Sequence, residues 1–272
     1  MAPTRVLYAA QVLKIQTANS VFNSGLGVQS ASCETNIPIE DLSVLSKLGS
    51  AGRFQKEVAT CKSEIKIYAT AGLGTIIAGL ITDADAGTLR QIIVEPNGFQ
   101  MSGILSSFSL DASKGDFVTA SLGFDGIGEA TQNTAPGSSL NSSVVRAVAL
   151  AITPMTSAEV SVGGGAGCPA SLKYSLDLPN ETITCLGTVI AGDNAAIKAG
   201  SSIFSKPPFK SSLNVDGLNV DINTAIKSFT VTSCISVDIT DGKIASKSFN
   251  QSAGDVGANY SQSVEGTSVT IS

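Results

Sequence analysis

The amino-acid sequence predicts an all-β protein with one or two short helices. Small and β-branched residues dominate the composition, which includes 27 Gly and 9 Pro in 272 residues, whereas aromatic residues make up only 5%. Several segments alternate apolar and polar residues with a period of two, which is the pattern of half-buried strands. Helix-like periodicity is scarce. The chain is long enough for one large domain or two smaller ones.

The first half of the chain contains the clearest pair of adjacent strands. Residues 104–110 and 118–124 alternate in polarity, and the turn residues at 113–116 lie between them, which predicts a hairpin. Residues 61–67 predict a further strand with its charges outward. Residues 72–81 predict a short buried helix, with a buried strand as the competing interpretation. Residues 41–48, followed by Gly49, predict a second short helix.

The second half also has strand signals. Residues 229–239 alternate with a period of two, and Asp241-Gly242 predicts a tight turn into a return strand that starts at Lys243. Residues 218–222 have the same period. The segment 193–199, followed by Gly200, resembles the helix candidate at 41–48.

The two halves are similar to each other over a long period. The matches keep their order along the chain and pair Cys33 with Cys185, Phe54 with Phe204, Lys62 with Lys210, Ser107-Phe108 with Ser248-Phe249, Ser121 with Ser261, and Gly126 with Gly266. A polar run rich in Ser, Gly and Pro separates the halves, as a linker would. The sequence therefore predicts two similar β-sandwich or half-barrel domains at residues 1–130 and 144–272, joined by a linker at 131–143.

Composition excludes several classes of function. The formal net charge is −5 and there is no His, so His-dependent catalytic groups and most zinc sites are ruled out, and no basic cluster favours DNA binding. The glycine run at 163–167 lacks the residues of a phosphate-binding loop. Three carboxylate pairs lack companions that would specify a site, namely Asp83/Asp85, Asp216/Asp221 and Asp238/Asp241. We expect no catalytic residue, no metal and no cofactor.

The cysteines and the apolar segments have ordinary explanations. The 5 cysteines form no C-x-x-C pair, so we expect buried reduced thiols, with disulfides between subunits through Cys33 and Cys185 as the alternative. Residues 71–82 are apolar but much shorter than the ~20 residues that a membrane-spanning helix needs. We therefore expect no membrane partner.

Several segments of the first half resemble the tail tube proteins of tailed bacteriophages. These are a "V-Q-S" strand at 28–33, the stretches at 40–49, 58–68 and 104–116, and a closing strand at 117–128 that fits the form "V-T-A-S-x-x-F-x-G-x-G". The resemblance covers most of residues 5–130. The second half resembles the family only through the internal repeat, with residues 260–266 as a looser copy of the closing strand.

The resemblance implies a structural protein of the virion tail, assembled in the host cytoplasm. Its copies would form stacked rings around a β-barrel lumen that conducts DNA during ejection without binding it specifically. A trimeric ring with pseudo-sixfold symmetry is favoured, and a hexameric ring is second. The other partners would be the tail terminator, the baseplate or tip and, as a further candidate, a sheath. The predicted intersubunit sheet contains Ile104, Phe108, Val118, Leu122 and Phe124.

A function of another class is a β-sandwich module that binds a surface or a carbohydrate, as part of a virion or an adhesin. Such a module needs an exposed aromatic platform, and the chain has no Trp and 4 Tyr. A closed ring, in contrast, needs only that each copy completes the sheet of the next. The sequence therefore favours the structural role.

Overall fold

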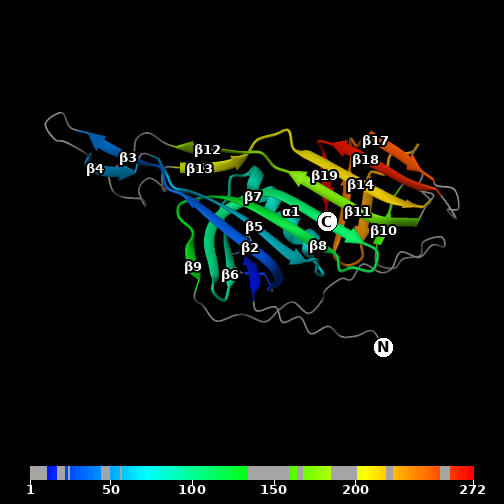
Figure 1. The fold of residues 1–272 in the computed structure, drawn as a ribbon, viewed down its shortest axis with the longest axis horizontal. Coiled ribbons are helices and arrows are strands. Elements are labelled where there is room, and N and C mark those ends of the chain that lie inside the picture. Colours follow the sequence, from blue (N-terminus) through cyan, green and yellow to red (C-terminus); the bar gives the residue numbers. More distant parts are fainter. Residues whose placement is uncertain are drawn as a thin grey trace.

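The computed structural model describes residues 11–16, 22–23, 25–43, 50–55, 57–133, 160–163, 168–184, 201–218, 223–251 and 258–272. Within these ranges the protein is built from strands and a single helix, α1 (Leu73–Asp85). The predicted all-β fold class with a short helix is confirmed. Figure 1 shows the strands arranged mainly as one long twisted sheet.

Six strands of the first half close into a barrel. Going around it, β7 is followed by β6, β1, β2, β5 and β8, and β8 pairs again with β7. All of these pairs are antiparallel. The strands are β1 (Val12–Ile15), β2 (Leu26–Asn36), β5 (Thr60–Tyr68), β6 (Arg90–Glu95), β7 (Gly98–Ser113) and β8 (Thr119–Ile127). A short strand, β9 (Thr131–Asn133), pairs with the first residues of β7.

The sheet continues from the barrel into the second half of the chain. Strand β7 is longer than its neighbours, and its last residues pair with β11 (Cys168–Asp177). Beyond β11 follow β14 (Lys210–Leu218), β18 (Asn259–Gly266) and β17 (Lys243–Asn250). The series β2–β5–β8–β7–β11–β14–β18–β17 therefore forms one continuous face of eight antiparallel strands (Figure 1).

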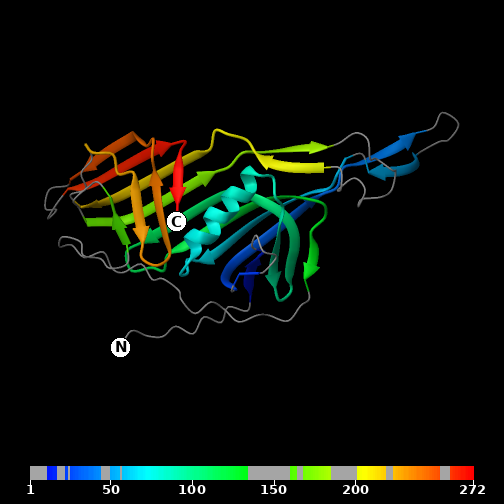
Figure 2. The same cartoon turned by 180° about the vertical axis from the view of Figure 1, so that it is seen from behind.

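Smaller sheets lie behind this face and at one end of it. Strands β10 (Val160–Val162), β15 (Ser228–Val231), β16 (Ile235–Ile239) and β19 (Val269–Ile271) form a four-stranded sheet in that order. Two hairpins project at the same end of the molecule in both views (Figures 1 and 2). They consist of β3 (Ile39–Ser43) with β4 (Ser50–Gln55), and of β12 (Asn180–Thr184) with β13 (Ser201–Ser205).

Helix α1 lies against the back of the long sheet, as Figure 2 shows. Its buried residues Leu73, Ile77, Leu80 and Ala84 recur at helical spacing and so form one apolar stripe. The helix contacts strands β7, β13, β16 and β19. At its N-terminus the amides of Gly72 and Gly74 donate to the Ser233 and Cys234 carbonyls in the other half of the chain, at 2.9 and 2.8 Å. The helix thus belongs to both halves.

The larger of the two hydrophobic clusters among the described residues runs through both halves of the chain. Its largest members include three aromatic rings that form a row, with Phe108 on β7, Tyr174 on β11 and Phe229 on β15. The ring centroids are 6.0 Å apart between Phe108 and Tyr174, and 5.5 Å apart between Tyr174 and Phe229. All three side chains are at most 1% exposed. The two halves are therefore joined by packing as well as by the sheet.

Two sets of four strands are paired in the same order. Strands β2, β5, β8 and β7 are neighbours in one set, and β11, β14, β18 and β17 in the other. In each set a projecting hairpin connects the first two strands, β3–β4 in one and β12–β13 in the other. The bulges also correspond. The first strand of each set is irregular just before Ser30 and Ser171, and the last strand just before Ser107 and Ser246.

This correspondence changes the alignment that the sequence suggested. The bulges make Ser246, not Ser248, the counterpart of Ser107, so Phe249 corresponds to Leu110 instead of Phe108. A shift of two residues leaves every side chain on the same face, so alternation cannot detect it. The match of Ser121 with Ser261 agrees with the strand bounds. The counterpart of Cys33 by strand position is Tyr174, and Cys185 lies outside the described residues.

The matched glycines Gly126 and Gly266 both stand where backbone or side chains approach closely. A Cβ on Gly126 would clash with the Ser102 carbonyl oxygen and crowd the Cys61 sulfur. A Cβ on Gly266 would clash with Ile239 and crowd the Asp241 carboxylate. These positions therefore require the smallest residue for reasons of space.

Several predicted elements differ from the structure. Residues 41–43 belong to strand β3, not to a helix, and residues 44–49 and 193–199 lie outside the described residues. The alternating segment 229–239 is two strands, β15 and β16, separated by a turn with Ser233 at φ 59°. Strand β17 pairs with β18 and not with β16, so Asp241-Gly242 connects two sheets. The three residues of this turn leave the paired residues Val231 and Ile235 four positions apart, an even number, so the period-two alternation continues through the turn and did not reveal the break.

The structure describes only part of the predicted linker at 131–143. Residues 131–133 of the predicted linker form β9, and residues 134–143 lie outside the described part of the chain. The hairpin of 104–124 is confirmed as β7–β8, the strand at 61–67 as β5, and the helix at 72–81 as α1. The division into domains 1–130 and 144–272 stays a prediction.

Because the core is shared, the two halves should unfold together. Replacing Phe229 by Ala removes a buried ring and should cost about 3–5 kcal/mol of unfolding free energy. Replacing the exposed Phe249 by Ala should cost less than about 1 kcal/mol in the isolated chain. Denaturant unfolding followed by circular dichroism measures both. Two separate transitions, with only one moved by Phe229→Ala, would contradict a shared core.

Candidate assembly interface

The eight-stranded face ends in two strands that, within the described part of the chain, have no partner strand along most of one side. Strand β1 pairs with β2 only at Leu26 and Gly27. From residue 29 to residue 36, no strand of the described chain pairs with the outer side of β2. Strand β17 pairs with β18 on one side, and within the described ranges no strand lies on its other side. Free edges of this length are sites for pairing with another chain.

The edge strand β17 carries an exposed aromatic residue. Phe249 is 60% exposed, although its ring lies 5.7 Å from the ring of Tyr260 on β18. Its counterpart in the first set, Leu110, is 1% exposed because β11 covers it. The Phe249 side chain therefore faces the apolar layer at a place where the next strand is missing. An exposed ring on an unpaired edge strand is available for contact with a strand of another chain.

The opposite edge, β2, presents small apolar groups on the same side of the sheet. Ala31 and Cys33 are half-buried and pack against the hydrophobic core. Cys33 is a free thiol, and its partial burial raises its pKa. Cys61 and Cys234 are buried, as expected for the thiols at these positions.

The five residues predicted for an intersubunit sheet lie in the core of a single chain. Their side chains are at most 1% exposed, and they are Ile104, Phe108, Val118, Leu122 and Phe124. Strands β7 and β8 have neighbours of the same chain on both sides. These residues are therefore not contacts at an edge. Sequence alternation identifies buried strands but does not tell which strand of a sheet is outermost, so it did not single out Phe249. Cys33 was named from the sequence only as a candidate for a disulfide between subunits.

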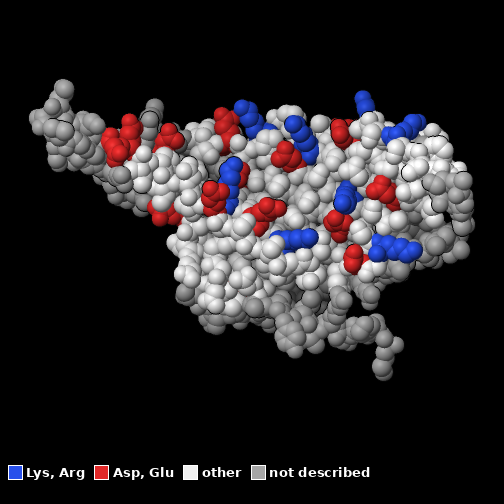
Figure 3. Space-filling model, in the orientation of Figure 1, with Lys and Arg blue, Asp and Glu red and all other residues white. Residues whose placement is uncertain are grey.

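The solvent face of the long sheet carries charges of both signs, as Figure 3 shows. Its strands also present serines, such as Ser121, Ser175 and Ser212. Its lysines lie mostly opposite carboxylates. Lys62 on β5 is directly opposite Glu34 on one side and Asp125 on the other. The Lys173 ammonium is 3.7 Å from the Asp111 carboxylate across the β7–β11 junction, and Lys210 is opposite Asp177. This face offers no continuous basic track.

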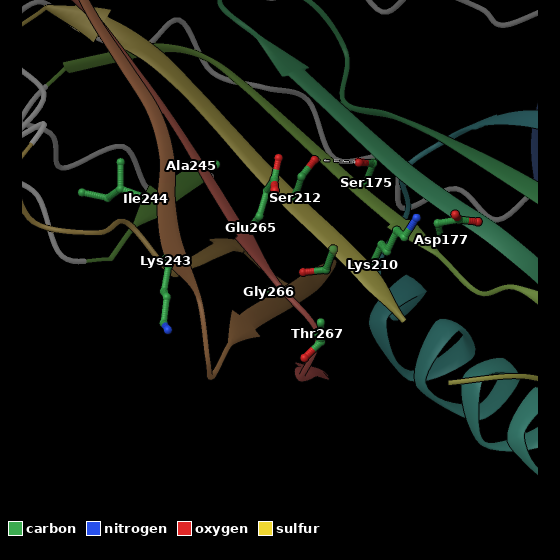
Figure 4. Close-up of a pocket in the computed structure, with 11 residues that line it drawn as sticks. Ser175, Asp177, Lys210, Ser212, Lys243, Ile244, Ala245, Glu265, Gly266 and Thr267 are labelled. Atoms are coloured by element: carbon green, nitrogen blue, oxygen red, sulfur yellow. Dashed lines mark hydrogen bonds between the residues drawn. The ribbon is translucent and has the colours of Figure 1, made fainter. Parts of the chain in front are cut away.

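A hollow of about 620 Å³ opens on this face at one end of the second set of strands (Figure 4). It is lined by side chains such as Ser175, Lys210, Ser212 and Glu265, and the hydroxyls of Ser175 and Ser212 are 2.9 Å apart. None of the described residues that line it is aromatic. It is therefore unlike a sugar site built on ring stacking.

Three of the six carboxylates that the sequence singled out, Asp83, Asp216 and Asp241, have structural partners, and Asp221 lies outside the described residues. Asp83 at the end of α1 accepts two hydrogen bonds from Arg90 on β6, at 2.6 and 2.7 Å, which fixes the helix to the barrel. Asp216 accepts a hydrogen bond from the Ser171 hydroxyl at 3.1 Å. No group of three or more metal-ligating side chains occurs among the residues described.

Asp241 fixes the connection that leads into the edge strand β17. Its carboxylate accepts hydrogen bonds from the Thr267 hydroxyl at 2.7 Å and from the backbone amides of Thr267 and Ser268 at 2.9–3.1 Å. The Thr267 hydroxyl, followed by the two amides, lowers the pKa of Asp241 to about 2. The turn before β17 is thereby tied to the turn after β18.

Comparisons with known proteins give no family for this chain. No protein-family model matches it, and no curated protein does. A chain in the structure described as the virion of a native gene transfer agent particle is similar to it, with 16% identity and a TM-score of 0.33. The match covers 44% of this chain and 95% of the other. Among the described residues, no helix is long and apolar enough to cross a membrane.

The low pKa of Asp241 predicts a titration at acidic pH. The charged form is stabilised in the folded protein, so this contribution to stability is fully present above the ordinary aspartate pKa and is lost as the pH falls through about 2. Carboxyl NMR should therefore show Asp241 still ionised at pH 3. In the variant Thr267→Val, which lacks the hydroxyl donor, the pKa should rise. An unchanged pKa in that variant would contradict the assigned contact.

Proposed function

We propose that this protein is the structural subunit of a bacteriophage tail tube, in which rings of the chain stack around a β-barrel lumen that conducts DNA during ejection. The observation that carries the proposal is the eight-stranded sheet with an open edge at each end, β2 and β17. Each copy can extend the sheet of the next copy through these edges. A ring that closes leaves no edge exposed, so closure limits the assembly.

Three copies are the favoured number in a ring. The two sets of four strands have the same pairing order and lie side by side in one sheet. Three copies would supply six such sets, and the ring would have pseudo-sixfold symmetry. At the usual strand spacing and tilt, a barrel of ~24 strands is roughly 50 Å across between backbones. That is wider than a DNA duplex.

Six copies with the second set of strands on the outside is the alternative arrangement. In that arrangement the second set of strands would not form part of the lumen wall. In the single chain, β11 instead continues the sheet of β7, with seven residues in register. This continuity supports the three-copy ring. The chain then contributes all eight strands of the long sheet to the wall.

The solvent face of the long sheet suits the lining of a DNA channel. Lysines on a lumen wall attract phosphates and would slow the passage of DNA. Here Lys62, Lys173 and Lys210 lie opposite carboxylates, and the protein as a whole carries a net charge of −5. A duplex would meet a wall of serine hydroxyls and balanced charges. Such a wall offers few lasting contacts.

Stacking of the rings is supported by the hairpins at one end of the molecule. Hairpins β3–β4 and β12–β13 project at the same end (Figures 1 and 2). They, and the residues that lead into them, carry exposed apolar side chains, since Ile39 is 59% exposed, Ile183 45% and Ile37 39%. Contact with the next ring would cover these groups. The tail terminator and the baseplate or tip would take the place of a ring at the two ends of the tube.

The edge contact predicts a variant that folds but does not assemble. Replacing Phe249 by Glu places a charge where the next copy should pack, so rings and tubes should be lost while the single chain keeps its circular dichroism spectrum. The matched control is Asn250→Glu, which adds the same charge to the next residue, on the solvent face. It should still assemble. Electron microscopy and native mass spectrometry measure both variants.

The same measurements on the unchanged protein test the proposed function. Rings with three copies are the expected result. Rings with six copies would overturn the three-copy ring and retain the tube. A chain that stays single at every concentration, with β2 and β17 uncovered, would overturn the tube itself.

A further inference from the structure

Building on the proposed ring, we infer the register of the contact between copies. Strand β17 of one copy pairs antiparallel with β2 of the next, and Phe249 lies directly opposite Cys33 of the neighbouring copy. The inference rests on the proposed function for the existence of the contact. The register itself follows from the junction that the chain already contains between its two sets of strands.

That internal junction joins the last strand of the first set to the first strand of the second. Strand β7 pairs with β11, with Leu110 opposite Tyr174 and Phe108 opposite Leu176. These side chains are all 1% exposed and belong to the shared core. On the solvent side of the same junction, Asp111 is opposite Lys173. The contact between copies likewise joins the last strand of a set, β17, to the first strand of a set, β2.

The bulges and strand bounds fix which residues correspond. The first strands are related by Ser30 and Ser171, which stand 141 positions apart, as do Ile39 and Asn180, where the hairpins begin. Tyr174 therefore corresponds to Cys33. The last strands are related by Ser107 and Ser246, which stand 139 positions apart, so Leu110 corresponds to Phe249. Transferring the pairing of Leu110 with Tyr174 places Phe249 opposite Cys33.

The side chains at this pair are complementary in size. In the internal junction the large ring is on the first strand, as Tyr174, and the smaller residue is Leu110. In the contact between copies the ring is on the last strand, as Phe249, and the small residue is Cys33. Phe249 is 60% exposed in the single chain, and Cys33 is half-buried beside the core. A neighbour in this register would cover the ring with an apolar surface.

Other registers fit the two edges less well. A slip of one residue turns Phe249 toward the solvent face, where the β2 residues are polar. A slip of two residues keeps the faces but places the ammonium group of Lys247, or the amide of Gln251, against Cys33 in the apolar layer. On the solvent face, the inferred register sets Glu34 opposite Ser248. Both of these residues are exposed in the single chain, so they can be changed without disturbing the core.

Disulfide trapping in the assembled protein tests the register. Residues directly opposite each other in an antiparallel pair have Cα atoms about 4.5–5.5 Å apart, within the reach of a disulfide, whereas partners shifted by two are about 7–8 Å apart. The double variant Glu34→Cys/Ser248→Cys, made with Cys33→Ser, should form covalently linked dimers and trimers on oxidation. The matched variants with Ser246→Cys or Asn250→Cys in place of Ser248→Cys should link at least several-fold less.

A second variant keeps the native thiol. Phe249→Cys should link to Cys33 of the next copy, and the link should disappear when Cys33→Ser is added. Rings seen by electron microscopy, together with efficient linking at Ser246→Cys or Asn250→Cys, would overturn the register and leave the tube intact. Absence of any ring or oligomer in the unchanged protein would overturn the proposed function instead. Rings in which none of the pairs link would overturn the pairing of β17 with β2.

Discussion

The unpaired backbone at the two ends of the long sheet is the constraint on which the rest of this structure depends. Strand β2 from residue 29 onward and strand β17 each expose a row of N–H and C=O groups without a strand beside them in the described chain. In a monomeric protein such edges are usually short, charged or covered. Here one edge carries Phe249 and the other Cys33, both on the apolar side. The edges are therefore suited to pairing, and a matching pair on the same chain lets a ring close.

Packing in the interior of the molecule holds the two edge strands in a fixed orientation relative to each other. The row of rings formed by Phe108, Tyr174 and Phe229 crosses the junction between the halves, and helix α1 is bonded to the turn between β15 and β16. The two halves cannot swivel about β7–β11 without breaking this packing. The angle between the two edges is consequently set by the fold. A fixed angle is what decides how many copies close a ring.

The sequence predicted the strands that are buried on one face, because alternation reports burial. It therefore located β5, the β7–β8 hairpin and the apolar stripe of α1. It could not separate β15 from β16, since the turn at Ser233 preserves the alternation, and it equated Phe249 with Phe108 because a slip of two residues changes no face. Order within a sheet depends on contacts distant in sequence. For that reason the sequence could assign the buried residues Val118 and Leu122 to a predicted intersubunit sheet but could not identify the strands at its edges.

The chain contains one complete junction between a last strand and a first strand, that of β7 with β11, whereas the edge strands β17 and β2 have no such partner in the described chain. Inside the chain the pair of Leu110 with Tyr174 is buried at the level of a core. At the outer edges the corresponding positions hold Phe249 and Cys33. Exposing the Phe249 ring costs the single chain little free energy, because the ring lies beside that of Tyr260. If the outer pair were as apolar as the inner one, single chains would associate without regard to register. A ring set against a small thiol gives both attraction and a unique fit, because only one register brings the two together.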